Sequence, residues 1–453
     1  MKVLVISEAI APAGVIASVR WTKIAKYLSK NHGVEVDVLT TSKRYSETPR
    51  ATYCKFDVGL AQDMRHFYKI WEIPRGGCCK LADSVFVCGE AVLSAVRMIV
   101  ERFGSGGEEA EASSVTKSSQ LDLYGAVLRL KGRSIIGKAK RMPVGWSEYD
   151  IVVSSFSPRW VHVLGKWVKD NIPEIPWVAD FRDSAVSIPD VPEEEKSTFA
   201  QVYAGEADCI TGVSQGVIDN LNIPESKMTQ VIPNGYDPED LSSRSRCRSE
   251  KFVISYTGTL YSEESFKSDM TPILEAVKEA IIAEDISPED VLMVYAGASS
   301  SLFEAQMRDY ADVIPCMDLG LIDRSECYKL QDSSSLLVLC TWNTKEMQGI
   351  VTGKIFEYLS SGVPIIGLCS GDLGDSTVKE MLAKAEAGVC YEEANGKADF
   401  PMLKSYVLEK YAEWKADGLT NVKTNSQYIA SFGYDSIAER YYDLFRSLQK
   451  VTQ

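Results

Sequence analysis

The chain of 453 residues has few histidines and lacks the cysteine spacings that build zinc sites and disulfide frameworks. It contains three histidines, His32, His66 and His162, and its 11 cysteines are irregularly spaced with no CxxC pair. A Cys/His zinc site therefore has little support, and we expect no metal centre. Reduced thiols in a cytoplasmic protein are the simplest account of the cysteines.

Long apolar runs and an excess of basic residues are also absent. No stretch approaches the roughly 18 uninterrupted apolar residues of a transmembrane helix. The opening MKVLVISEAIAP is too short in its apolar part for a secretory signal and is typical of a first buried strand. The formal net charge of -14 at pH 7 argues against a general nucleic-acid binder, which would carry a basic balance or stripe.

Two phosphate-binding motifs are missing as well. No complete GxGxxG follows the first expected strand, so a nicotinamide cofactor has weak support. No GxxxxGK followed by Ser or Thr occurs either, which argues against an ATPase of the P-loop type.

What is present is an alternation of short apolar runs with helical patterns. Residues 3–7 form such a run, followed by apolar residues at helical spacing over 16–28 and by a second run over 34–39. A strand–helix–strand unit of this kind has its first loop at the carboxyl end of a strand, where open α/β sheets bind ligands. Further strands are expected at 150–155, 177–180, 209–213, 228–232, 252–256, 291–295, 336–340 and 364–368, and further helices at 157–168, 270–282 and 355–361.

The length exceeds one ordinary core, and the alternation predicts two α/β domains in series. We expect residues 1–235 to form an N-terminal Rossmann-like domain, interrupted by a helical or flexible insertion over 58–147. Residues 251–432 are expected to form a second such domain. The polar segment 236–250 follows a Pro-Asn-Gly turn and is expected to be the linker between them.

The segment from Arg129 to Arg141 carries six basic residues and no acid. Two interpretations are open. The segment is either a solvated helix face or a patch that attracts anionic lipid head groups or a lipid-phosphate acceptor. It stands out because the whole chain is acidic.

An acid stands one turn inside the helical pattern that begins near residue 353. Thr352 or Gly353 lies at the helix start, which leaves backbone amides unpaired and suits a diphosphate. Lys354 adds a positive charge, and Glu357 follows three residues later on the same face. The helix dipole keeps such a carboxylate ionised, and the two vicinal hydroxyls of a ribose match it. A capping acid without a ligand is the alternative.

GKIFEYLSSGVPII, at 353–366, resembles the K-x-F-E-Y-L-x-x-G-x-P-V-I segment of the family 4 glycosyltransferases, which have the GT-B fold. Further segments resemble that family in the same order along the chain: MKVLVISEAIAP with Gly14 and Arg20, SFSPRWVHVLGKWV, WVADFRDS, VIPNGYD, YTGTLY, VYAG and FGYDSIAERYYDLF. The match covers most of the chain outside 58–147.

The resemblance implies two Rossmann-like domains whose parallel sheets face a central cleft, with 433–453 as a terminal helix that crosses back to the first domain. It implies a retaining hexosyltransferase that moves a sugar from a UDP- or GDP-linked donor to a hydroxyl, with no metal and no further cofactor. A sugar-nucleotide epimerase of the same fold and a catalytically idle nucleotide-sugar-binding protein are the alternatives.

The acceptors that are typical of the family, together with the basic segment, favour a glycan or lipid-linked acceptor. The expected setting is surface polysaccharide biosynthesis by a cytoplasmic protein, peripheral at the inner face of a membrane through Arg129–Arg141.

The resemblance places the donor on the second domain. Where the family commonly has an arginine after the first donor-domain glycine, this chain has Thr259, so Lys267 or Lys354 is expected to supply the charge. Asn343 either touches the nucleobase or a phosphate or fills the corner of a loop. The donor-binding candidates are Glu357, Lys354, Gly353, Thr352, Gly258, Thr259, Lys267 and Asn343.

The family often has two acids eight positions apart near the donor. Glu357 matches the second, but the first falls on Gly349, so Glu346 is the nearest acid that is expected to contact the transferred sugar.

The acceptor side is expected on the first domain, where Gly14 and Arg20 match the opening of the family. Arg182 and Asp183, at the end of an expected strand, either contact an acceptor hydroxyl or phosphate or form an internal salt link. His162 either takes part in the reaction or is a core histidine on an apolar helix.

Overall fold

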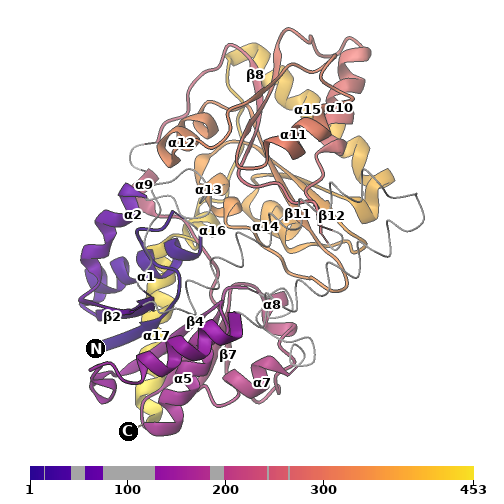
Figure 1. Ribbon diagram of the computed structural model, residues 1–453. Coiled ribbons are helices and arrows are strands. Elements are labelled where there is room, and N and C mark those ends of the chain that lie inside the picture. Colours follow the sequence, from indigo (N-terminus) through magenta and orange to yellow (C-terminus); the bar gives the residue numbers. More distant parts are fainter. Residues whose placement is uncertain are drawn as a thin grey trace, which may run out of the picture. The chain divides into compact units, whose positions relative to one another are not determined.

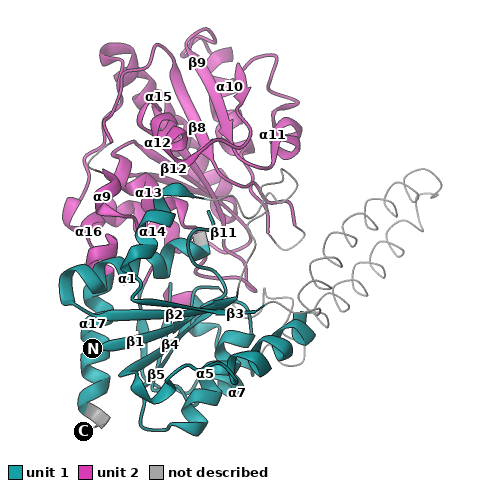
Figure 2. Ribbon diagram, turned by 60° about the vertical axis from the view of Figure 1, so that its left-hand side comes forward, with its two compact units in different colours: residues 1–213, 217–232, 438–453 teal, residues 214–216, 233–437 magenta. Residues whose placement is uncertain are grey.

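The computed structural model describes residues 1–14, 16–41, 57–74, 128–183, 198–241, 244–263 and 266–452. The chain divides into two compact units, which are coloured separately in Figure 2. Unit 1 comprises residues 1–213, 217–232 and 438–453, and unit 2 comprises residues 214–216 and 233–437. Each unit contains one parallel sheet; one apolar cluster packs on the sheet of unit 1, and two pack on that of unit 2 among the described residues.

Unit 1 is built on a seven-stranded sheet of order β3-β2-β1-β4-β5-β6-β7, in which every neighbouring pair is parallel. Its strands are β1 (Lys2–Ile6), β2 (Glu35–Thr41), β3 (Lys69–Ile73), β4 (Ile151–Phe156), β5 (Trp177–Phe181), β6 (Cys209–Gly212) and β7 (Thr229–Val231). Val3 of β1 lies opposite Val36 on one side and Ile151 on the other. The strand order reverses here, and the carboxyl ends at such a reversal form a crevice.

The helices of unit 1 are α1 (Ile16–His32), α2 (Val58–Asp63), α5 (Trp160–Asn171), α7 (Phe199–Ala204) and α8 (Gln215–Asp219), with the 3-10 turns η1 (Met64–His66) and η2 (Trp146–Glu148). The first two residues of α8 are grouped with unit 2. Residues 128–139 are also helical. The last helix, α17 (Tyr434–Thr452), belongs to unit 1 from residue 438 onward.

Unit 2 is built on a six-stranded parallel sheet of order β10-β9-β8-β11-β12-β13. Its strands are β8 (Phe252–Thr257), β9 (Val291–Ala296), β10 (Cys316–Asp318), β11 (Leu336–Trp342), β12 (Ile365–Ser370) and β13 (Gly388–Glu392). Its helices are α9 (Pro238–Leu241), α10 (Thr271–Ile282), α11 (Ser300–Met307), α12 (Arg324–Asp332), α13 (Lys354–Ser361), α14 (Thr377–Ala385), α15 (Gly396–Asp417) and α16 (Ser426–Ala430), with the 3-10 turn η4 (Glu393–Asn395).

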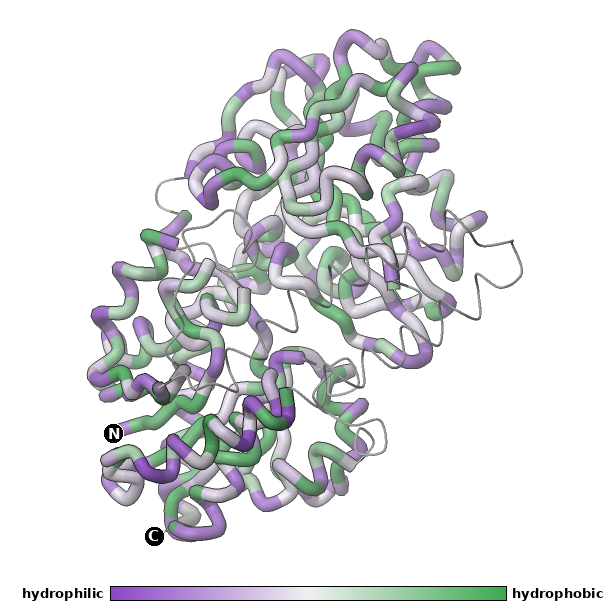
Figure 3. The backbone as a smooth tube through the Cα atoms, viewed as in Figure 1, coloured by the Kyte–Doolittle hydropathy of each residue, from purple (hydrophilic) through white to green (hydrophobic). Residues whose placement is uncertain are grey.

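The side chains of β11 alternate between two apolar cores of unit 2. Leu336, Val338 and Cys340 pack with α10 and α15, whereas Leu337 and Leu339 pack with α13 and α14. Helices therefore cover both faces of this sheet (Figure 1), as the continuous apolar run of β11 requires. The tube in Figure 3 changes repeatedly between hydrophobic and hydrophilic along the helices, which is typical of helices with one apolar face.

The prediction of an α/β fold with two Rossmann-like halves is confirmed by these two parallel sheets. The structure differs from the expectation within 58–147, because β3 lies there and pairs with β2. The sequence of β3, KIWEI, has only one fully buried residue, Ile73, since the strand is at the sheet edge. It therefore lacks the apolar run that identifies a central strand. Residues 75–127 of the expected insertion lie outside the described residues.

The expected linker segment 236–250 is grouped with unit 2 and bonded to it. Arg244 Nη2 lies 2.7 Å from Asp332 Oδ1, and both side chains are less than a tenth exposed. Arg246 Nη1 donates to the carbonyl of Gly362 at 2.7 Å. These bonds attach the polar segment to unit 2, although its composition alone suggests a mobile connection.

One buried carboxylate, that of Asp180 on β5, links five elements of unit 1. Arg20 Nη2 donates to Asp180 Oδ1 at 2.9 Å, and both side chains are at most 1% exposed. Side chains from α1, β4, β6 and α17 donate to the same carboxylate: Trp21 and Ser155 at 2.9 Å, Thr211 at 2.9 Å and Tyr441 at 2.8 Å. Burial alone would raise the pKa of Asp180, but Arg20 and these donors outweigh it and lower the pKa to about 2.

We expect Asp180→Asn to lower the free energy of unfolding of unit 1 by about 3–5 kcal/mol, because it leaves the Arg20 charge buried without its partner. The folded pKa of Asp180 lies below its unfolded value near 3.8, so its contribution is present above about pH 4. It is lost as the pH falls from about 4 towards 2. Urea unfolding between pH 2.5 and 7 measures both effects.

Asp170→Asn is the matched control, because Asp170 pairs with Lys166 at 2.8 Å but half of its side chain is exposed. We expect this variant to change stability by less than about 1 kcal/mol. Equal losses of unfolding free energy in the two variants would contradict the conclusion that the Asp180 network dominates the stability of unit 1.

Candidate functional site

The candidate site lies in unit 2, where the loop after β8 meets the start of α13. Gly258, directly after β8, has a φ of 127°, which favours glycine. A Cβ at this position would lie 2.9 Å from both Cε and Nζ of Lys354, the first residue of α13. Glycine at 258 therefore lets the lysine side chain lie against the backbone of the loop.

The ammonium group of Lys354 is enclosed by this loop and by an aromatic ring. Lys354 Nζ donates to the hydroxyl of Tyr256 and to the carbonyl of Thr259, the latter at 3.4 Å, and lies 4.1 Å from the centre of the Tyr256 ring. Burial lowers the pKa of Lys354 from 10.5 to about 8. No carboxylate pairs with Lys354 among the described residues, so a bound anion would stabilise its charged form.

The start of α13 has polar groups that no side chain satisfies. No side chain caps this helix at Gly353, and Thr352 Oγ1 is buried without a hydrogen-bond partner in the part of the chain that the structure describes. The positive end of the helix dipole and these groups lie beside Lys354. The arrangement favours an anion with several oxygen atoms.

Glu357 lies one turn further along α13 and is paired with Arg324, the first residue of α12. Arg324 Nη2 donates to Glu357 Oε1 at 3.1 Å, and the two side chains are 28% and 29% exposed. Arg324 Nε also donates to the hydroxyl of Tyr328 at 2.7 Å. Arg324 is not predictable from the sequence, since no motif marks it and the pairing depends on the packing of α12 against α13.

Six of the eight donor-side candidates gather at this place: Thr352, Gly353, Lys354, Glu357, Gly258 and Thr259. The structure does not bring Lys267 or Asn343 into these contacts. Lys267 Nζ pairs with Asp269 at 3.2 Å and Glu393 at 3.4 Å, whereas Lys354 Nζ donates to the carbonyl of Thr259. Asn343 Nδ2 donates to the carbonyls of Leu373 and Gly374 in the loop after β12. These bonds fit the interpretation that Asn343 fills the corner of a loop.

The loop between β11 and α13 carries Glu346, which is exposed to solvent. Gly349 in the same loop has a φ of 69°. This left-handed backbone conformation favours glycine over an acid and is a local physical reason for the absence of a carboxylate at 349.

The acceptor-side candidates lie in unit 1, and Arg20 among them is a structural residue of the Asp180 network. Arg182 Nη1 pairs with Asp183 Oδ2 at 3.3 Å, and Arg182 Nη2 donates to the carbonyl of Ser157 at 2.8 Å. This pair has the geometry of an internal salt link, although 39% of the Asp183 side chain is exposed. Gly14 is exposed in the loop that follows β1.

His162 is a buried residue of α5, with no exposed surface. Its Nδ1 lies 2.7 Å from Ser154 Oγ, and its ring centre lies 4.5 Å from that of Phe181 and 5.3 Å from that of Phe156. Burial lowers the pKa of His162 to about 3, so the ring is neutral. These contacts correct the catalytic assignment: His162 is a core histidine.

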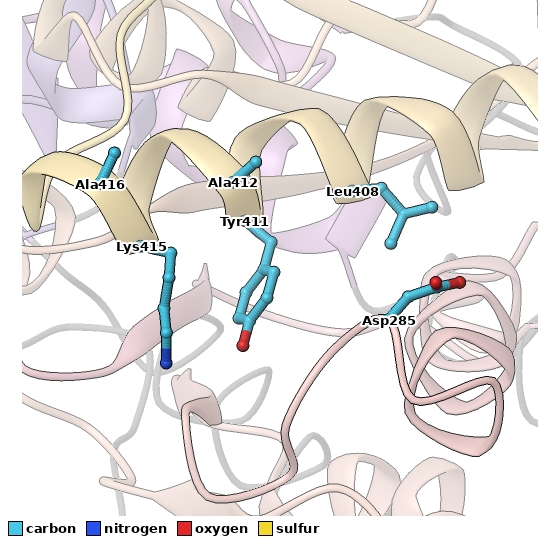
Figure 4. Close-up of a pocket in the computed structure, with 6 residues that line it drawn as sticks. All are labelled: Asp285, Leu408, Tyr411, Ala412, Lys415 and Ala416. Atoms are coloured by element: carbon cyan, nitrogen blue, oxygen red, sulfur yellow. The ribbon is translucent and has the colours of Figure 1, made fainter.

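A shallow hollow of about 560 Å³ lies elsewhere in unit 2, between α15 and Asp285 (Figure 4). Its tyrosine and lysine, Tyr411 and Lys415, both bind Asp290 at 2.6 Å. Its other lining residues are small or apolar: Leu408, Ala412 and Ala416. None of them belongs to the group around Lys354, and we assign no function to this hollow.

The described ranges contain neither a metal-binding cluster nor a membrane-spanning helix. No group of three or more His, Cys, Asp and Glu side chains there is arranged to hold a metal ion. The helices in those ranges reach neither the length nor the apolar content of a membrane span.

No family model and no curated protein matches the sequence. Solved structures do match: the N-terminal domain of trehalose-6-phosphate phosphatase from Candida albicans is 11% identical, with a TM-score of 0.59 over 99% of this chain and 97% of that chain. A trehalose-6-phosphate protein from E. coli bound with UDP-2-fluoro glucose is 11% identical, with a TM-score of 0.56 over 99% of both chains. A glycosyltransferase from Rickettsia africae is 14% identical, with a TM-score of 0.52 over 99% and 98%.

These similarities extend over whole chains at low identity, and they establish the fold. The chain has the GT-B fold, in which two Rossmann-like units follow each other along the sequence.

We expect Gly258→Ala to destabilise unit 2, because the added Cβ meets Lys354 and the backbone conformation disfavours alanine. The expected loss is about 2–3 kcal/mol in thermal or urea unfolding. Gly320→Ala is the matched control, since Gly320 also has a positive φ, 60°, but no atom lies within 4 Å of its Cβ position. We expect the control to lose about 1 kcal/mol. A loss at 258 no greater than that at 320 would show that the contact with Lys354 is not tight.

Proposed function

We propose that the chain is a retaining glycosyltransferase that moves a sugar from a nucleotide diphosphate sugar to a hydroxyl of an acceptor, without a metal. One observation carries the proposal. The first turn of α13 combines an enclosed lysine with unsatisfied polar groups at its start, and an ionisable acid follows within one turn. A diphosphate joined to a ribose offers the complementary groups in the same order.

In this proposal the diphosphate lies at the start of α13. The amides of Gly353 and Lys354 donate to phosphate oxygens, and Lys354 supplies a full positive charge. Thr352 Oγ1, which is buried and unpaired among the described residues, gains a partner when the anion binds. Glu357 accepts hydrogen bonds from the vicinal hydroxyls of the ribose.

The fold supports a nucleotide-sugar donor. The E. coli protein of the same fold, cited above, is bound to UDP-2-fluoro glucose. The donor base of this chain is open between uracil and guanine. Glu346 is the proposed contact to the transferred sugar. It is the acid of the loop that leads into α13, because position 349 of that loop is a glycine.

The proposed acceptor is a glycan or a lipid-linked saccharide, bound by unit 1 near Gly14, Arg182 and Asp183. A lipid-linked acceptor would fit a protein at an anionic membrane surface, and the basic segment is the proposed contact. Of its six cations, Lys131 pairs with Glu8 at 3.1 Å and Lys138 donates to the carbonyl of residue 74 at 2.8 Å. Three others, Arg133, Lys140 and Arg141, are exposed and are the ones available to lipid phosphates.

We expect UDP or GDP to raise the melting temperature of the protein, with a stabilisation of about 2.7 kcal/mol at 100 times the dissociation constant. Glu357→Gln should weaken this binding about tenfold, because the neutral amide is a poorer acceptor for the ribose hydroxyls. Glu304→Gln, an exposed acid on α11, is the control and should bind as the parent does. Titration calorimetry gives the constants.

If neither nucleotide binds the parent, the donor site on α13 is wrong. A protein that binds the nucleotide and converts UDP-N-acetylglucosamine without an acceptor would be an epimerase instead. Binding without turnover in the presence of sugar nucleotide and a panel of glycan acceptors would favour the idle binding protein.

We expect the affinity for a nucleoside diphosphate to fall as the pH rises above about 8. Lys354 loses its proton near that pH in the free protein, and a bound diphosphate stabilises the charged form and raises its pKa. The fall should approach tenfold per pH unit between pH 8.5 and 9.5. Burial raises the pKa of the neighbouring thiols, Cys327 to about 11 and Cys340 to about 12, so they titrate above this range.

Lys354→Met is the control for this pH dependence. It should bind more weakly at pH 7.5 and show a flat profile from pH 7.5 to 9.5. An equally steep fall in the variant would assign the titration to another group.

A further inference from the structure

We propose that Arg324 is the positioning residue for Glu357: it holds one carboxylate oxygen and thereby presents the other to the ribose of the donor. The inference rests on the proposed function of the α13 site and deepens it. It adds Arg324, from a different helix, α12, which is not among the donor-binding candidates predicted from the sequence.

The contact between the two side chains is one-sided. Arg324 Nη2 donates to Glu357 Oε1 at 3.1 Å. In the part of the chain that the structure describes, Glu357 Oε2 has no hydrogen-bond partner, and 29% of the side chain is exposed. One oxygen is therefore fixed while the other can accept hydrogen bonds from a ligand.

The guanidinium group is itself held by two further side chains. Arg324 Nε donates to Tyr328 Oη at 2.7 Å, and Nη2 lies 3.7 Å from Asp240 Oδ2 on α9. Burial disfavours the charged guanidinium, but Glu357, Tyr328 and Asp240 outweigh it and raise the pKa of Arg324 above its ordinary value. The cation is therefore present at every pH at which the protein is folded.

The two helices that carry the pair are bonded to the same strand. On α12, Gln331 Nε2 donates to Thr257 Oγ1 of β8 at 3.1 Å. On α13, Tyr358 Oη accepts from the amide of Thr257 at 3.0 Å. Thr257 thus connects both helices to the end of β8, and the separation of Arg324 from Glu357 is set by buried contacts. Because both helices are held by buried hydrogen bonds, Arg324 keeps the carboxylate of Glu357 in one orientation before the ligand binds.

The test compares ribose and dideoxyribose ligands. The probes are the nucleoside diphosphate that binds the parent, UDP or GDP, and its 2′,3′-dideoxy form, measured by titration calorimetry. We expect the parent to prefer the ribose form by about tenfold. Arg324→Met should weaken the ribose form five- to tenfold and leave the dideoxy form within twofold, so that the preference nearly disappears. Arg324→Lys, which keeps the charge, should restore part of it.

Combining Arg324→Met with Glu357→Gln tests whether the arginine acts through the acid. In the Glu357→Gln protein, which already lacks the preference, the second substitution should cause no further loss of ribose binding. Lys329→Met removes an exposed cation from the same helix and should leave the preference unchanged. The dideoxy affinity reports whether the diphosphate site is still folded in each variant.

The outcomes separate the two proposals. If the parent binds neither nucleotide, the proposed function fails and the ribose contact fails with it. A parent that prefers ribose, together with an Arg324→Met variant that keeps this preference, overturns the positioning role and leaves the function intact. Tighter ribose binding in Arg324→Met also overturns it, because the arginine would then compete with the ligand for Glu357.

Discussion

The carboxylate of Asp180 is the interaction on which unit 1 depends. A charge with no exposed surface is tolerable only when every lone pair has a donor, and here the donors come from α1, β4, β6 and α17. Arg20 adds a bond to the carbonyl of Ile232, beyond the end of β7. The network therefore fixes the register of elements on both sides of β5, and it explains why an arginine that matches an acceptor motif is a structural residue here.

Unit 2 has a comparable constraint at the end of β8, where both backbone and side-chain groups take part. The approach of Lys354 to Gly258 and the bonds of Thr257 to both α12 and α13 concentrate polar groups at the end of one strand. Within the described ranges, this place holds the desolvated cation of Lys354, the hydroxyl of Thr352 without a partner and the carboxylate of Glu357 bonded through one oxygen. A buried polar or charged group is less stable without a partner than with one, and this is the physical reason to propose a ligand at the site.

Features that depend on residues close together in the sequence could be predicted. Contacts that depend on the packing of distant segments could not. The central strands and the start of α13 were predictable, because apolar runs and the order Thr-Gly-Lys-Ile-Phe-Glu are local. Arg324 stands 33 residues from Glu357, and Tyr256 stands 98 residues from Lys354, so only the fold brings these partners together. His162 shows the opposite failure. Its motif suggested a catalytic role, but a motif carries no information on burial. The aromatic residues that enclose His162 come from β4, β5 and α7.

The membership of α17 in unit 1 has a consequence for biosynthesis. Tyr441 donates to Asp180 across 261 residues of sequence, and the whole of unit 2 is translated between them. At about 5–20 residues per second, the ribosome needs on the order of tens of seconds to cover that distance. Throughout this interval the nascent first unit contains Arg20 and Asp180 without the helix that covers them. Unit 1 therefore cannot complete this network until the whole of unit 2 has been synthesised.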